Sequence, residues 1–250
     1  MAQNDEGAGR FWEFYALRYS VGAVLGALII FLLVKQTPQL SDLIFIKKGE
    51  SIDMIQVGVF LGIGLFYSYL ASAPILVFHV GRFLIPRADD SFFNDSGWVW
   101  AIYLFASLLL PVLFAVFSPL DSGIRAWFSV IIFLASAVFF GQLLIIKKCH
   151  SQRKKLFLFY KNLSTNRAYA TGGIVDSYRH LREHGNAFGI IFFEMMLAVF
   201  LFAASHGILA KRLEPFEVAA TFGAVILAWI MPATLVWLIG CIVEQEFVDS

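Results

Sequence analysis

A single acidic residue, Glu194, lies within an otherwise apolar stretch that reads FGIIFFEMMLAVFLF. In hydrocarbon, an ionised carboxyl group costs several kcal/mol unless it is paired, neutralised or facing water, so such residues usually mark functional sites. His79 and Gln142, near the ends of two other apolar stretches, are the candidate partners. We therefore predict an intramembrane polar site at Glu194. Its role is either a structural hydrogen bond between helices or the handling of a proton or ion.

A second chemical pattern occupies the five residues from His180 to His184. It resembles the H-x-x-E-H motif of the inverted zinc peptidases. The resemblance implies that His180 and His184 bind zinc while Glu183 activates a metal-bound water, with a third ligand from Glu244 or Glu246. A membrane-tethered metal-dependent hydrolase is one alternative function on this basis. The simpler interpretation is that the histidines are solvated, in which case no cofactor and no enzymatic activity are expected.

These residues belong to a strongly basic segment, defined here as residues 147–186. It holds nine of the nineteen Lys and Arg residues. Three roles are open: contact with anionic lipid headgroups, docking of a cytoplasmic protein, and nucleic-acid binding, which is not expected because no known nucleic-acid-binding fold fits so few residues. The candidate docking residues are Arg153, Lys154, Lys155, Lys161, Arg167, Arg179 and Arg182.

The composition places the rest of the chain in a lipid bilayer. Hydrophobic residues make up 59% and charged residues 15% of the 250 positions, against about 45–50% and about 25% in soluble proteins. The two cysteines, Cys149 and Cys241, have no metal-type spacing and are interpreted as incidental. Functions that require a water-soluble fold are therefore excluded for most of the chain.

The apolar stretches predict six membrane spans. A helix needs about 20 apolar residues to cross about 30 Å of hydrocarbon, and backbone groups in lipid must bond internally. We therefore expect an all-α polytopic fold and a single membrane domain over residues 1–250. The predicted spans are about 16–35, 56–81, 97–119, 126–146, 187–210 and 218–243.

The orientation of the spans follows from the basic residues, because Lys and Arg accumulate on the cytoplasmic side. Six spans place both termini and the basic segment on one side, together with thirteen of the nineteen Lys and Arg residues. We therefore expect an integral protein of a bacterial inner membrane with these parts in the cytoplasm.

Glycine and proline residues interrupt several predicted helices. Gly172 and Gly173 are expected to divide the basic segment into two helices, and Gly185 with Asn186 is expected to end the second. Pro74, Pro111 and Pro232 lie inside predicted spans and are expected to kink them.

Small residues recur at four-residue spacing in the first two spans. Gly22 and Gly26 form a GxxxG pair, and Gly58, Gly62 and Gly64 follow in the next span. Such residues let helices approach closely, either within one bundle or between copies of the chain.

The expected function is that of an interaction or assembly component. In this interpretation the chain forms an oligomer in the membrane and binds cytoplasmic or membrane protein partners through its basic segment. A channel or small transporter that uses Glu194 is the first alternative, and the hydrolase is the second.

Overall fold

The computed structural model describes residues 5–43, 54–84, 97–118, 120–169, 173–211 and 214–248. Every regular element in these ranges is a helix, and they contain no strand, which confirms the predicted all-α class. The elements are α1 (Asp5–Gln36), α2 (Pro38–Leu43), α3 (Met54–Ala71), α4 (Ala73–Val80), a 3-10 turn η1 (Gly81–Leu84), α5 (Gly97–Phe117), α6 (Ser122–Ser151), α7 (Arg153–Tyr169), α8 (Gly173–Lys211) and α9 (Pro215–Val248).

Length and hydropathy identify five membrane-spanning candidates among the described residues. They are Tyr19–Gln36, Met54–Leu84, Ser122–Ser151, Gly185–His206 and Pro215–Gln245. A shorter apolar helix, Ala101–Phe117, lies within α5 at the place of the predicted third span. The chain is therefore a membrane-embedded, multi-pass helical protein, and the sixth span stays a prediction.

The fold divides into two compact units. The first comprises Met1–Ser72 and Glu183–Leu227, and the second comprises Ala73–Arg182 and Ala228–Ser250. The boundaries fall between α3 and α4, within α8 and within α9. The expected single membrane domain over residues 1–250 stays a prediction.

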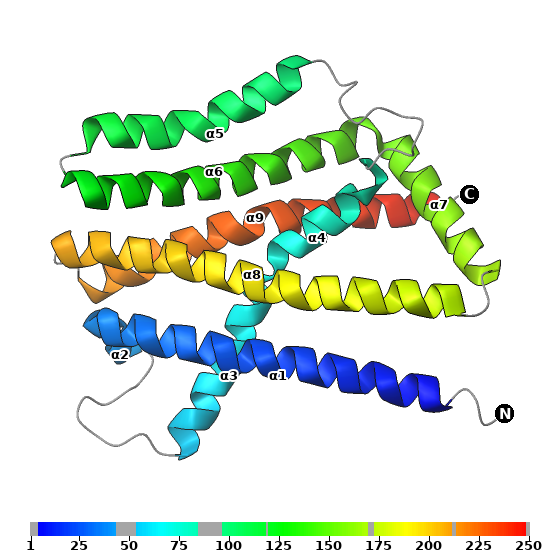
Figure 1. Cartoon of the computed structure of the whole chain (residues 1–250), viewed down its shortest axis with the longest axis horizontal. Coiled ribbons are helices and arrows are strands. Elements are labelled where there is room, and N and C mark those ends of the chain that lie inside the picture. Colours follow the sequence, from blue (N-terminus) through cyan, green and yellow to red (C-terminus); the bar gives the residue numbers. More distant parts are fainter. Residues whose placement is uncertain are drawn as a thin grey trace. The chain divides into compact units, whose positions relative to one another are not determined.

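In the first unit, α1 and α3 pack against each other (Figure 1). Three small residues make this approach possible. A Cβ atom added to Gly26 would collide with the carbonyl oxygen of Gly64, and one added to Gly64 would lie 2.8 Å from the Cα atom of Ala27. Gly58 and Gly62 have no atom within 4 Å of such a Cβ. Packing within the bundle thus explains why Gly26 and Gly64 are glycines. It does not explain the glycines at positions 58 and 62.

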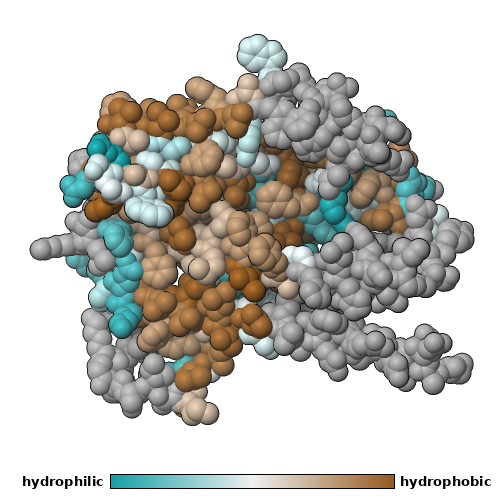
Figure 2. All heavy atoms as spheres, viewed as in Figure 1, coloured by the Kyte–Doolittle hydropathy of each residue, from teal (hydrophilic) through white to brown (hydrophobic). Residues whose placement is uncertain are grey.

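The second unit contains the α5–α6 pair, whose helices lie side by side (Figure 1). Many exposed side chains of this pair are large and apolar, for example Phe105 at 67% and Trp127 at 72% exposure. On the face drawn in Figure 2, the surface over α5 is mostly hydrophobic. Such a surface is suited to contact with lipid rather than with water.

The same unit holds two clusters of buried apolar side chains. One consists of Val77, Ala233 and Val236. The other joins η1, α6, α7 and α9 and is called here the anchor cluster; it consists of Phe83, Cys149, Leu156 and Val243.

The prolines and glycines have different effects on the helices. The break between α3 and α4 falls at Ser72, two residues before Pro74, because proline cannot donate to the carbonyl of the preceding turn. Helices α5 and α9 continue through Pro111 and Pro232. Helix α8 also continues through Gly185, where the sequence suggests an end. That expectation is wrong because continuing the helix keeps every backbone bond internal at the membrane boundary.

Candidate functional site

Glu194 lies on the buried face of α8 in the first unit. Its side chain is 0% exposed, and Leu197, Ala198 and Leu201 continue the same buried face at helical spacing. Both carboxylate oxygens are buried without a hydrogen-bond partner. Because most buried polar atoms in proteins are bonded, this residue is an exception that requires an explanation.

Gly22 on α1 provides the space for the carboxyl group. A Cβ atom added there would lie 3.0 Å from Glu194 Oε1, and it would also collide with the hydroxyl oxygen of Ser68 on α3. The Ser68 hydroxyl is thus a donor within reach of the carboxylate, although neither carboxylate oxygen accepts a bond of regular geometry. Ser68 itself is 4% exposed. The carboxyl and hydroxyl groups therefore share a space that any side chain at position 22 would fill.

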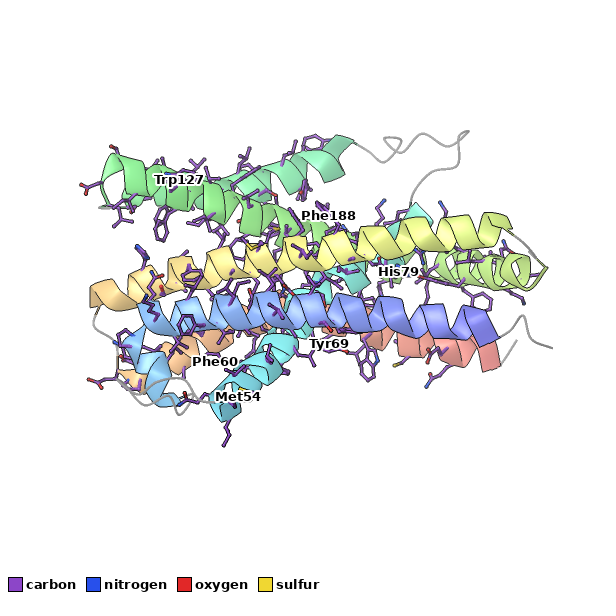
Figure 3. The ribbon with its side chains drawn as sticks, turned by 60° about the horizontal axis from the view of Figure 1, so that its bottom comes forward. Met54, Phe60, Tyr69, His79, Trp127 and Phe188 are labelled. Atoms are coloured by element: carbon purple, nitrogen blue, oxygen red, sulfur yellow. The ribbon has the colours of Figure 1, made fainter. Side chains whose placement is uncertain are left out.

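Tyr67 holds the backbone of α8 beside this space. Its hydroxyl donates a 2.7 Å hydrogen bond to the main-chain carbonyl oxygen of Glu194, and its side chain is 3% exposed. The next residue but one on α3, Tyr69, is labelled in Figure 3 and stacks on Tyr19 of α1 with 5.1 Å between ring centroids. Together, Gly22, Tyr67, Ser68 and Glu194 form what is called here the carboxylate site.

The electrostatics of the carboxylate site favour a neutral acid. An ionised carboxylate without a partner is very costly to bury, whereas a protonated one loses only hydrogen bonds. The contacts that the structure describes between Glu194 and α1 or α3 involve Gly22, Ser68 and Tyr67, none of which carries a positive charge. The arrangement can therefore hold a proton without a counter-ion.

The two partners predicted for Glu194 belong to the second unit. His79, on α4 (Figure 3), has its Nε2 atom 2.7 Å from Nη2 of Arg82, and the Arg82 Nε group donates to the His79 carbonyl oxygen at 2.9 Å. Gln142 on α6 is 1% exposed, and its Oε1 atom has no partner. Pairing of either residue with Glu194 stays a prediction.

Sequence reasoning identified Glu194 but did not assign Gly22, Tyr67 and Ser68 to its site. The glycine was visible as half of a GxxxG pair, and the tyrosine and serine were visible as polar groups within an apolar span. Their meeting with α8 joins positions 127 residues apart, between Tyr67 and Glu194. Periodicity within one helix gives no information on such a contact.

Within the basic segment, Lys147 and Lys148 lie at the end of α6, and α7 carries the described candidate docking residues. Arg153, Lys154, Lys155 and Lys161 are exposed, and the Lys161 ammonium lies 5.7 Å from the centroid of the Phe157 ring. On the same helix, Leu156 is 2% exposed and packs in the anchor cluster. The side chains of Arg167, Arg179 and Arg182 lie outside the described residues.

The predicted metal site cannot be placed in the same way, because the side chains of His180, Glu183, His184 and Glu246 also lie outside the described residues. Glu244 is described and exposed. The described part of the chain holds no group of three potential metal ligands. The zinc site stays a prediction.

No protein-family model, curated protein or solved structure matches the chain.

Proposed function

We propose that this membrane protein is an interaction component that binds a cytoplasmic protein with an acidic surface through helix α7. The observation that carries the proposal is the fixed position of that helix. Leu156 is buried in the anchor cluster while Arg153, Lys154 and Lys155 remain exposed on the same two turns. In the proposed orientation, both termini and the basic segment face the cytoplasm of a bacterium.

The anchoring distinguishes α7 from a loose basic tail. Phe157, Phe159 and Tyr160 pack at the edge of the anchor cluster, so apolar side chains hold the helix while its basic side chains remain exposed. Docking onto a preformed surface avoids the entropy cost of ordering it. A fixed pattern of charges also gives specificity, which attraction to lipid headgroups does not need.

The test combines crosslinking in native membranes with direct binding of the captured protein. A triple charge reversal, R153E/K154E/K155E, is compared with the charge-conserving triple R153K/K154R/K155R. We expect the captured protein to bind the purified wild-type chain and the conserving triple more weakly as salt is raised. The reversed triple should bind at least about tenfold more weakly, a loss of about 1.4 kcal/mol.

Two results would overturn this proposal. One is equal binding of the captured protein to both triples. The other is a reversed triple whose sole defect is weaker binding to vesicles of anionic lipid, because the basic side would then serve the membrane surface alone.

A channel or small transporter is the second candidate function. The buried carboxyl group of Glu194, which accepts no hydrogen bond of regular geometry, favours it. Polar groups within the membrane commonly line ion or proton pathways. If the protein conducts, Glu194→Gln should reduce flux into proteoliposomes or change its pH dependence while insertion stays normal. Unchanged flux in that variant would exclude Glu194 from the pathway.

A further inference from the structure

We propose that the carboxylate site is a proton-binding site within the membrane, in which Glu194 carries an exchangeable proton while α1, α3 and α8 are packed together. Releasing this proton leaves a carboxylate, which requires water to reach the site. Rebinding restores the neutral acid. The proposal does not depend on docking at α7, because it concerns a different unit of the fold and has a chemical readout.

The Ser68 hydroxyl suits both protonation states of the carboxyl group. A serine hydroxyl has one hydrogen to donate and lone pairs that accept. It can therefore accept from a protonated carboxyl group and, after rotation, donate to an ionised one. Gly22 leaves room for this exchange, since a Cβ there would meet both Ser68 Oγ and Glu194 Oε1.

A proton fits the site better than a metal cation does. Calcium takes about 6–8 oxygen ligands, and magnesium requires a near-ideal octahedron. The described side chains offer the two carboxylate oxygens and the Ser68 hydroxyl, because the Tyr67 hydroxyl is directed to the Glu194 carbonyl oxygen. A proton needs only one of these oxygens.

Among the side chains that the structure describes, the titratable or charged groups of α3 are Tyr67 and Tyr69. Those of α1 are Tyr19 and Lys35, and Lys35 lies in the last turn of that helix. Arg18 precedes Gly22 by one helical turn, and its side chain lies outside the described residues.

Two further titratable groups lie at the ends of helices in this unit. His206, toward the end of α8, has its Nδ1 atom 3.0 Å from Nε2 of Gln36. Glu217, near the start of α9, is exposed, and its Oε2 atom accepts a 3.0 Å bond from the Glu214 amide. His206 follows Glu194 by twelve residues on α8, about 18 Å along the helix axis, and Glu217 is itself an acid, so neither group neutralises Glu194.

Infrared difference spectroscopy of the full chain in lipid bilayers tests the proposal directly. The spectrum of Glu194→Gln is subtracted from that of the wild type across a pH series, in H₂O and in D₂O. We expect the difference to contain the carbonyl band of a protonated carboxyl group. This band should shift in D₂O, shrink as pH rises and return when pH is lowered.

The absence of that band at every pH would overturn the proposal, because Glu194 would then be ionised throughout. A band that neither shifts in D₂O nor responds to pH would overturn it as well, because the proton would not exchange.

Two further variants test the geometry without removing the carboxyl group. Ser68→Ala should shift the band, since the hydroxyl partner is lost. Gly22→Ala should also shift it, whereas the matched variant Gly58→Ala, which meets no atom within 4 Å, should leave it unchanged. If Gly22→Ala does not fold, the Ser68→Ala variant tests the geometry of the site by itself. An unshifted carbonyl band in Ser68→Ala would exclude Ser68 from the site.

Discussion

Gly26 of α1 and Gly64 of α3 bring the main chains of their helices into direct contact. A Cβ atom added at position 26 would lie 3.0 Å from the carbonyl carbon and 3.1 Å from the Cα atom of Gly64, and it would collide with the carbonyl oxygen. Backbone atoms cannot swing aside as the end of a flexible side chain can. The contact therefore fixes the separation of α1 and α3 and, with it, the space in which Glu194 lies.

The first prediction concerns this contact. Gly64→Ala should destabilise the protein by about 1–3 kcal/mol, the usual cost of overpacking a well-packed site. The loss in the free energy of unfolding can be measured on the purified protein in a mild detergent, by titration with a denaturing detergent. Gly62→Ala is the matched control, because its new methyl group meets no atom within 4 Å. Equal stability of the two variants would show that α1 and α3 do not pack through Gly64.

The second prediction concerns the hydrogen bond that holds α8 to α3. Tyr67→Phe should cost about 0.5–1.5 kcal/mol, because it removes the buried donor to the Glu194 carbonyl while keeping the ring. The same unfolding titration measures this loss of stability in the Tyr67→Phe variant. Tyr69→Phe provides the comparison, since Tyr69 is 53% exposed and its ring can still stack on Tyr19. A larger loss in Tyr69→Phe than in Tyr67→Phe would contradict the role of the bond.

The helical class of this protein could be predicted from the sequence because the signal is compositional. Long apolar runs leave the backbone no partner in lipid other than itself, so each run becomes a helix whatever its neighbours are. Glu194 could be identified for a related reason, because an acidic residue in such a run is conspicuous without knowledge of the fold.

The partners of these residues could not be predicted, because they depend on how the helices rotate against each other. Gly58, Gly62 and Gly64 look alike in sequence, yet only Gly64 faces α1 closely in the structure. Likewise, nothing in the α3 sequence indicates that Tyr67 reaches a carbonyl oxygen on α8. Local patterns give the spacing of residues on one helix but not the face that its neighbour covers.

The third prediction separates anchoring from charge on α7. Leu156→Ala should loosen the helix by about 2 kcal/mol or more, the lower end of the usual cost of truncating a buried leucine. Trypsin cleavage after Lys154, Lys155 and Lys161 should become faster, because these sites open locally more often. Leu158→Ala is the control on the same helix, since Leu158 is 54% exposed against 2% for Leu156.

The proposed docking function adds a second readout to this pair of variants. Leu156→Ala keeps every basic residue, yet it should weaken binding of the captured partner because the charges lose their fixed position. Partner binding that is unchanged while trypsin cleavage is accelerated would show that the order of α7 is irrelevant to docking.

The fourth prediction decides whether α5 crosses the membrane. If it does, the segments before and after it must face opposite sides. In a background with Cys149→Ser and Cys241→Ser, single cysteines are introduced as Asn94→Cys, Asp121→Cys and Asn162→Cys. A membrane-impermeant thiol reagent added to intact cells should label position 121 and should leave positions 94 and 162 unlabelled until the membrane is opened. Labelling of positions 94 and 121 from the same side would show that α5 does not span the bilayer, and the number of spans would then be odd.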